Sequence, residues 1–242
     1  MLPFLKKVQE ARRLRCAALV AAAGSSQRMG GVNKLLQPLD GVPVLVRTLA
    51  AFQVAGSVDE IIVAAREEDI LEISQLCRTY GLSKCTKVIR GGESRVHSVL
   101  LAALEAGLET ELLAVQDGAR PLATPELIDR VVSAAARCGA AAPAVALKDT
   151  VKLVREDGGV EETLDRPRLR AVQTPQVFQA SLLKAALQSA LEQEAPITDD
   201  ASAVERLGKV VFLVEGEEEN LKITTPLDMI LAEAIIKERE EV

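Results

Sequence analysis

Aromatic residues and histidine are scarce in this chain. Its 242 residues include four Phe, one Tyr, no Trp and a single histidine, His97. Five aromatic side chains cannot build the stacking platform that holds single-stranded nucleic acid. Lys and Arg number 29 against 35 Asp and Glu, so the net charge is −6 and non-specific attraction to phosphate backbones is weak. We therefore expect no nucleic-acid partner, although a local basic patch is still possible.

Cysteine is also sparse, and its spacing is uninformative for metals. The four cysteines are Cys16, Cys77, Cys85 and Cys138, and no two form a CxxC unit. With one histidine in the chain, this argues against a zinc site and against a triad built on His97. We expect the cysteines to be small buried apolar residues of a reduced protein.

Long apolar runs are missing. No run approaches 18 residues, so we expect no membrane span and no membrane partner. Arginines before residues 16–23 give a superficial likeness to a signal peptide, but the run is short and enters a Gly/Ser loop, as a buried strand does. We expect a cytoplasmic protein with an N-terminal extension at 1–15 and a single domain at 16–242.

Apolar runs alternate with helical patterns along the chain. Strands are expected at 17–23, 60–65, 86–89, 112–116, 140–147 and 209–214. Helices are expected at 43–55, 67–79, 94–105, from 125 onward after a Thr124 cap, and at 180–191, 199–206 and 226–237, the last with a Thr225–Asp228 capping box. This alternation predicts an α/β fold, a parallel sheet with helices on both faces.

The segment 148–170 interrupts the rhythm. Polar and apolar residues alternate at 150–154, Asp157-Gly158-Gly159 is a turn signal, and the return is polar. An isolated hairpin is marginally stable. We therefore expect this segment to pack on a second subunit.

The first strand leads into a glycine- and serine-rich loop at 24–33. Ligands of open α/β sheets bind outside the carboxyl ends of strands, where glycine lets backbone N–H groups approach phosphate. Arg28 and Lys34 add positive charge. The loop matches neither GxxxxGK[ST] nor GxGxxG. A plain connection is the alternative, and the two cations favour phosphate binding.

Two further segments contain charged residues at the ends of apolar runs. Asp117 could hold Mg²⁺ and Arg120 could pair with phosphate, or the pair could be an Asx-turn with a surface arginine. Thr198-Asp199-Asp200 and 221–225 could be no more than helix caps. Lys222 stands out because it ends a short apolar run.

Six motifs occur in one order: LVAAAGSSQRMG with a following NK, VQDGARP, LKDTVK, DRPRLRAVQTPQVF, ITDDASAVE and VEGEEENLKITTPLD. Together they resemble the 2-C-methyl-D-erythritol 4-phosphate cytidylyltransferase family of the non-mevalonate isoprenoid pathway, over about residues 16–238. The resemblance implies a Rossmann-like nucleotidyltransferase fold with a mostly parallel sheet, and a homodimer formed through an extended β-arm at about 148–170.

The resemblance also implies a reaction and a set of site residues. CMP passes from CTP to 2-C-methyl-D-erythritol 4-phosphate, with Mg²⁺, and pyrophosphate leaves. The catalytic cations are Arg28, Lys34 and Lys222, and the metal ligand is Asp117. The CTP-binding residues are Ala22, Ala23, Gly24, Ser25, Ser26, Gly91, Gly92 and Ser98. The residues for the polyol phosphate are Arg120, Thr150, Arg166, Thr174 and Thr198, of which Thr150 and Arg166 reach the partner's substrate.

This chemistry is compatible with the scarcity of histidine. A phosphate monoester is already an anionic nucleophile at neutral pH, so the reaction needs no general base. Catalysis then depends on positioning and on cations that stabilise the accumulating negative charge. Departures from the family pattern at Gln27, Glu93, Gln116 and Gly118 remove none of the assigned charges.

Three alternatives remain open from the sequence. The closest is a cytidylyltransferase for another polyol phosphate such as D-ribitol 5-phosphate, which shares the loop and the DGARP-like motif. A non-catalytic CTP sensor on the same fold is a second. A purely structural dimer is a third.

Overall fold

We describe the protein from a computed structural model, and the description covers residues 13–24 and 33–241. The first strand, β1 (Cys16–Ala22), lies in the middle of the sheet. Its neighbours on either side, β4 (Glu60–Ala65) and β6 (Leu112–Asp117), both run parallel to it. Because β1 is covered on both faces, its sequence is a continuous apolar run rather than an alternating one.

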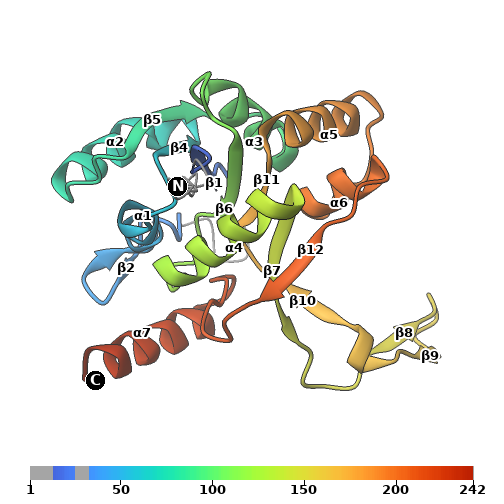
Figure 1. Ribbon diagram of the computed structural model, residues 1–242. Helices are drawn as coiled ribbons and strands as arrows, with labels where there is room; N and C mark the ends of the chain where they lie inside the picture. The colour runs from blue at the N-terminus through green and yellow to red at the C-terminus, as the bar shows by residue number, and fades with distance from the viewer. Residues whose placement is uncertain (1–12, 25–32, 242) are drawn as a thin grey trace, which may run out of the picture.

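The sheet is mostly parallel, as predicted (Figure 1). Its strand order is β10-β7-β11-β6-β1-β4-β5, and β12 pairs with β7. Strands β1, β4, β5 and β6 run in the same direction, and β12 is parallel to β7. The remaining bounds are β5 (Cys85–Arg90), β7 (Ala140–Ala146), β10 (Arg170–Val172), β11 (Gln176–Gln179) and β12 (Phe212–Glu215).

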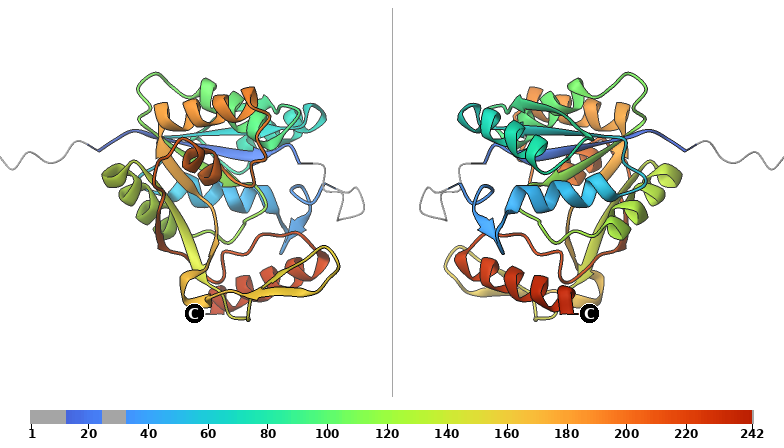
Figure 2. Two further views of the ribbon diagram at one scale, coloured as in Figure 1. Left: turned by 90° about the vertical axis from the view of Figure 1, so that its right-hand side faces the viewer. Right: turned by 90° about the vertical axis from the view of Figure 1, so that its left-hand side faces the viewer.

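Helices cover both faces of the sheet (Figures 1 and 2). Alternate residues of β1 divide between two apolar clusters, with Val20 on one side and Leu19 on the other. The helices that pack on the Val20 side are α1 (Val44–Val54), α2 (Ile70–Thr79), α4 (Pro125–Cys138) and α7 (Pro226–Glu241). Those on the Leu19 side are α3 (Arg95–Glu105), α5 (Ala180–Glu192) and α6 (Asp200–Arg206).

Helix starts follow the predicted capping chemistry in two cases. The Thr124 hydroxyl accepts a hydrogen bond from the Leu127 N–H at 3.0 Å at the start of α4. The Asp228 carboxylate accepts from the Thr225 N–H at 2.7 Å, and the Asp228 N–H donates back to the Thr225 hydroxyl at 3.4 Å, which makes a capping box. At α6 the cap is Asp199 rather than Thr198.

The sequence reading missed two strands that matter for the site. Strands β10 and β11 run antiparallel to β7, and β11 also pairs antiparallel with β6. They have three and four residues and flank Pro175, so they are too short to show a period. Smaller differences are the strand pair β2 (Pro38–Leu39) and β3 (Val42–Pro43), and the 3-10 turn Glu67–Asp69 that precedes α2.

The hairpin expected within 148–170 is formed by β8 (Lys152–Val154) and β9 (Val160–Thr163). It projects from the sheet at the end of β7, and a 3-10 turn at Arg166–Arg168 leads back to β10 (Figure 1). Every residue of β8 and β9 is exposed. The dimerising role of this arm, the single-domain organisation and the extension at 1–15 stay predictions, and residues 1–12 lie outside the described residues.

Candidate active site

The parallel register brings the carboxyl ends of four strands to one edge of the sheet. Ala22 pairs with Ala65, and Ala65 pairs with Arg90, so β1, β4 and β5 end level with one another. On the other side of β1, Ala21 pairs with Asp117 of β6. The residues that follow these ends therefore converge, which is where open α/β sheets bind ligands.

Glycines at this edge allow close approach of backbone segments. A Cβ atom on Gly91 would lie 2.6 Å from the Ala23 Cβ and 2.9 Å from the Ser98 Oγ, and one on Gly92 would lie 2.3 Å from the His97 ring. The buried Ser98 hydroxyl accepts a hydrogen bond from the Gly92 N–H at 3.0 Å. The Ser98 bond holds the 91–92 loop against α3, and the missing side chain of Gly91 leaves room for Ala23 after β1. Buried Ala22, half-buried Ala23 and exposed Gly24 lead from the core to solvent beside it.

Asp117 is the centre of a cluster of positive charge. Its carboxylate lies 2.8 Å from the Lys222 Nζ, 3.3 Å from an Arg95 guanidinium nitrogen and 3.7 Å from the Arg120 Nε. Burial raises the pKa of Asp117, but the charges of Arg95, Lys222 and Arg120 outweigh burial and bring that pKa below its ordinary value. The carboxylate is therefore ionised at neutral pH and surrounded by three cations.

A second carboxylate lies behind Arg95. The Asp200 side chain is fully buried, and its Oδ2 lies 2.8 Å from the Arg95 guanidinium. Burial raises the pKa of Asp200 above its ordinary value, against the opposing charge of Arg95. Arg95, at the start of α3, thus bridges Asp117 of β6 and Asp200 of α6.

Hydrogen bonds to the segment 220–223 position Lys222 beside Asp117 and link Lys34 to the same segment. The Lys34 Nζ donates to the Ile223 carbonyl at 2.7 Å, and Arg120 donates to the Asn220 carbonyl at 2.6 Å. The Ile223 N–H donates to the Ala119 carbonyl at 2.8 Å. These bonds place Lys222 beside Asp117 although 105 positions separate them (222 − 117).

Thr174 and neighbouring polar groups form the buried floor of this site. The Thr174 hydroxyl donates to the Gln116 Oε1 at 2.8 Å and accepts from the Asp117 N–H at 3.2 Å. Thr174 immediately precedes Pro175 and β11, so the unpredicted strand is what positions it. Within the described residues, the buried Gln116 Nε2 and Asn220 Oδ1 have no hydrogen-bond partner. Unsatisfied buried polar atoms gathered at one site are suited to a polar ligand.

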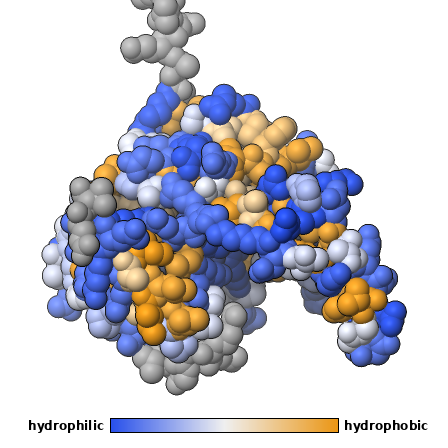
Figure 3. Space-filling model, turned by 90° about the horizontal axis from the view of Figure 1, so that it is seen from below, coloured by the Kyte–Doolittle hydropathy of each residue, from blue (hydrophilic) through white to orange (hydrophobic). Residues whose placement is uncertain are grey.

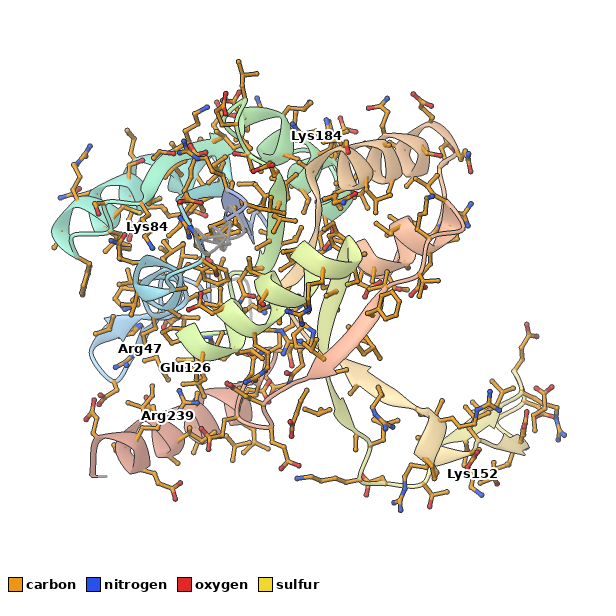
Figure 4. The ribbon with its side chains drawn as sticks, viewed as in Figure 1. Arg47, Lys84, Glu126, Lys152, Lys184 and Arg239 are labelled. Carbon is orange, nitrogen blue, oxygen red and sulfur yellow. The ribbon has the colours of Figure 1, made fainter. Side chains whose placement is uncertain are left out.

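The structure brings together most, but not all, of the predicted site residues. Lys34, Asp117, Arg120, Thr174 and Lys222 are joined through the contacts above. Thr198 is exposed, just before α6. Thr150 and Arg166 are exposed on the arm, which extends away from the body of this chain (Figures 1 and 4). Ser25, Ser26 and Arg28 lie outside the described residues.

Sequence reasoning missed Arg95 and Asp200 as parts of the site. The sequence shows Asp199 and Asp200 only as adjacent acids in a segment that helix capping could explain, and only the structure shows that Asp199 is the cap and Asp200 is buried. Arg95 gave no pattern of its own. Its role depends on which strand end and which helix start it faces.

The donor set at Asp117 is compatible with one Mg²⁺ bound mainly by phosphate. Mg²⁺ usually takes one or two carboxylates and completes its shell with substrate phosphates and water. The ionised Asp117 provides one carboxylate at the strand end. No group of three or more His, Cys, Asp or Glu side chains that could hold a metal exists within 13–24 and 33–241. Any magnesium here would therefore rely on nucleotide phosphates for most of its ligands.

Fold and site together define a nucleotidyltransferase of Rossmann-like architecture. The model of the family described as "IspD: 2-C-methyl-D-erythritol 4-phosphate cytidylyltransferase" matches residues 16–238. The chain belongs to this family.

Individual relatives agree with the family match. The chain is 44% identical over 219 residues to the 2-C-methyl-D-erythritol 4-phosphate cytidylyltransferase of Bacillus cytotoxicus, covering 90% of this chain and 96% of the relative. It is 45% identical over 224 residues to that of Microcystis aeruginosa, covering 91% and 98%.

Solved structures are similar in fold as well. The 4-diphosphocytidyl-2C-methyl-D-erythritol synthase of Anaerococcus prevotii has a TM-score of 0.83 at 31% identity, covering 93% of this chain and 99% of that chain. The 2-C-methyl-D-erythritol 4-phosphate cytidylyltransferase of Thermus thermophilus has a TM-score of 0.74 at 33% identity, covering 93% and 100%.

Proposed function

We propose that the protein transfers CMP from CTP to 2-C-methyl-D-erythritol 4-phosphate, producing 4-diphosphocytidyl-2-C-methyl-D-erythritol and pyrophosphate for isoprenoid precursor synthesis. The observation that supports this most directly is family membership across residues 16–238. The cation cluster around Asp117 at the carboxyl ends of the parallel strands supplies the matching chemistry.

The reaction we propose is an in-line displacement at the α-phosphate of CTP. An oxygen of the substrate's phosphate attacks the α-phosphorus, and the bond to the bridging oxygen of the pyrophosphate breaks. Two anions meet, so cations that are already in place lower the barrier most. We assign this task to Arg28, Lys34 and Lys222, and the fixed positions of Lys34 and Lys222 support it.

Nucleotide recognition is assigned to backbone-rich segments. Ala22 to Ser26 would follow the triphosphate with their N–H groups, and Gly91, Gly92 and Ser98 would recognise cytosine and ribose. The absence of side chains at 91–92 supports this, because a Cβ there would clash and a backbone edge is what remains. Base edges are commonly recognised by backbone N–H and C=O groups in this way.

Asp117 would hold Mg²⁺ together with the CTP phosphates. When bound, the metal supplies charge neutralisation and Lewis acidity to the triphosphate. Arg95, Lys222 and Arg120 keep Asp117 ionised, which is the state that binds a cation. Arg120, Thr174 and Thr198 would contact the polyol phosphate.

A homodimer would complete the site through the arm. Leu153, Val154 and Val160 on the hairpin are exposed, and so are Leu227 and Ile230 of α7. Figure 3 shows apolar surface on the arm and on the face below the body. An exposed two-stranded hairpin is marginal unless it packs on something. A second copy would cover it and bring Thr150 and Arg166 to the neighbouring substrate.

None of the helices in the described part of the chain has the length and apolar character that a membrane crossing requires. We also propose a cytoplasmic location, for which the sequence is the only support.

The decisive experiment is pyrophosphate release with paired substrates. Purified protein receives CTP, Mg²⁺ and 2-C-methyl-D-erythritol 4-phosphate in one tube, and D-ribitol 5-phosphate replaces that substrate in the other. Release with the methylerythritol substrate only is expected. Release with ribitol phosphate only would keep the mechanism and overturn the substrate. CTP binding without release in either tube would support a sensor instead.

A further inference from the structure

A pair of cysteines lies at the amino end of the edge strand β5. The proposed nucleotide site is at the opposite, carboxyl ends of the parallel strands. Cys77 is in the last turn of α2, and Cys85 is the first residue of β5. Their Sγ atoms are 3.3 Å apart, with one thiol hydrogen-bonded to the other. This distance is shorter than ordinary sulfur contact and close enough for a bond to form after a small side-chain rotation. The other cysteines, Cys16 and Cys138, are not paired with each other or with these two in the described residues.

The backbone between the two cysteines is a tight, hydrogen-bonded turn. The Leu82 N–H donates to the Cys77 carbonyl at 2.9 Å, and the Cys85 N–H donates to the Leu82 carbonyl at 3.0 Å. Leu82 is buried, and Gly81 adopts a φ of +65°, where glycine is favoured. One residue thus anchors both cysteine backbones. The turn therefore holds the two cysteine backbones near each other and keeps their sulfur atoms within 3.3 Å.

The pair is also open to small oxidants. A cavity of about 450 Å³ is lined by both cysteines together with Arg78, Ser83, Thr86 and Lys87. Cys77 itself is buried at 7% exposure, and Cys85 is half-buried at the cavity wall. The hydrogen bond between the two thiols and, more weakly, the charge of Arg78 outweigh burial and lower the pKa of Cys77, whereas the same hydrogen bond and burial raise the pKa of Cys85. Cys77 thus has the lower pKa of the two thiols, and a sulfenic acid formed on it would have Cys85 as a resolving partner 3.3 Å away.

We propose that Cys77 and Cys85 form a reversible disulfide when the protein meets a hydroperoxide, and that this pair is a modification site separate from the active site. With hydrogen peroxide, the Cys77 thiolate attacks one oxygen and forms a sulfenic acid while the O–O bond breaks and hydroxide leaves. The hydroxide takes up the proton that the Cys77 thiol lost and becomes water. The Cys85 sulfur then attacks the sulfenic sulfur and releases water. Two thiols are oxidised by two electrons, and one peroxide is reduced to two waters.

Trypsin offers a direct test, because it separates the two cysteines. Cleavage after Arg66, Arg78, Lys84 and Lys87 places Cys77 in peptide 67–78 and Cys85 in peptide 85–87. The folded wild-type protein is treated with hydrogen peroxide at low molar excess, denatured, alkylated and digested. Mass spectrometry is expected to find these two peptides joined, with the loss of two hydrogen atoms, while Cys16 and Cys138 remain alkylated. Dithiothreitol should separate the pair again.

Matched variants distinguish a disulfide from general oxidation. Cys85→Ser removes the resolving thiol, so dimedone is expected to trap a sulfenic acid on Cys77 and no joined peptide should form. Cys138→Ser keeps the pair and should leave the joined peptide unchanged. Alkylated Cys77 and Cys85 after treatment of wild type, or Cys77 converted to sulfinic acid without joining, would overturn the proposal. Recovery of Cys16 or Cys138 joined to either member would overturn it equally.

The disulfide should also be visible in stability. It would close a short loop at residues 77–85, and closing such a loop constrains the unfolded chain. We expect the oxidised protein to melt about 2–6 °C higher than the reduced protein. The Cys77→Ser variant should show no difference between the two conditions.

Discussion

Lys34, one of the cations that we propose for catalysis, is held in position by a hydrogen bond. Its ammonium donates to the Ile223 carbonyl, which ties the residue after the glycine loop to the segment that holds Lys222. A lysine fixed in this way has already lost the freedom that substrate binding would otherwise remove. This is the condition under which a charge contributes to the transition state rather than to binding alone.

Lys34→Ala should therefore lower kcat by about 10²–10³, the range for loss of one well-placed stabilising donor, with a much smaller change in CTP affinity. The measurement pairs steady-state kinetics with CTP titration calorimetry. Lys84→Ala is the matched control, since Lys84 makes the same kind of bond, to the Ala55 carbonyl at 2.7 Å, and is not among the proposed site residues (Figure 4). Equal losses of turnover and affinity for Lys34→Ala would contradict a transition-state role.

Asp117 leads to a prediction about pH. Its pKa is lowered by Arg95, Lys222 and Arg120 in excess of the effect of burial, so it stays ionised from neutral pH to well below pH 5. A lowered carboxyl pKa can remove activity only when the pH falls through that low value. The substrate's own phosphate, with a second pKa of about 6, loses its dianionic form first.

The acid limb of kcat/KM should therefore lie near the substrate's second pKa, about 6, and not near 4. A pH–rate profile measures it. Replacing the substrate by its phosphonate analogue, whose second pKa is higher, should move the limb upward. A limb that stays at the same pH with both substrates would assign it to the enzyme instead.

At the scale of elements, Arg95 joins three pieces of structure. It begins α3, contacts the end of β6 through Asp117 and meets the first residue of α6 through Asp200. The Arg95 guanidinium offsets part of the hydration that the fully buried Asp200 carboxylate loses, although burial still raises the pKa of Asp200. The pair thus couples the packing of α6 to the position of the carboxylate in the site.

Arg95→Gln should destabilise the protein by about 3–5 kcal/mol, because it leaves Asp200 buried without its partner. Adding Asp200→Asn in the same chain should recover most of that loss, as measured by urea unfolding. Activity should not recover with stability, because Asp117 still lacks Arg95. If the double variant is as unstable as the single one, Asp200 is not the group that Arg95 neutralises.

At the scale of the whole molecule, the arm formed by β8 and β9 is the feature that bears on how two chains would assemble. Its strands are exposed along their full length in one chain, and the arm and α7 both lie on the lower side of the molecule (Figures 1 and 2). Both carry exposed apolar residues, and apolar surface is visible from below on the arm and on the body (Figure 3). Thr150 precedes β8 and Arg166 follows β9 in this arm, which projects from the body of its own chain (Figure 1). A site completed by a second copy is the arrangement that would use them.

Val154→Asp should shift the protein toward monomer, since it places a charge in the proposed interface. Sedimentation velocity measures the shift, and Leu108→Asp is the control because Leu108 is also an exposed apolar residue, in the loop between α3 and β6 rather than on the arm. An unchanged dimer with Val154→Asp, or a monomeric wild type, would contradict the arm's role.

Mixed dimers test whether Arg166 acts across the interface. Arg166→Ala should raise the KM for the polyol phosphate, and mixing it with Lys34→Ala should restore part of the lost activity, because one of the two mixed sites then has both residues. Co-expressed, differently tagged chains allow the mixed dimer to be purified and assayed. No restoration would place Arg166 in its own chain's site.

The sequence by itself determined the α/β class, the central strands and the family. Buried parallel strands require continuous apolar runs, and the sequence predicted such runs at 17–23, 60–65 and 112–116, close to the observed β1, β4 and β6. The charged residues that follow such runs could be predicted as site candidates because strand ends converge. Lys34, Asp117 and Lys222 were predicted for that reason or from the family motifs.

Only the tertiary structure decided how distant segments meet. Strand β11 is too short to show a period, yet its insertion between β6 and β7 positions Thr174 under Asp117. The pairing of Arg95 with Asp200, and of Cys77 with Cys85, depends on how helix ends face strand ends across the fold. Sequence patterns indicate which residues are buried and which local structure they favour. Side chains from separate elements become neighbours only when those elements pack together, and no local pattern in one sequence shows which elements will do so.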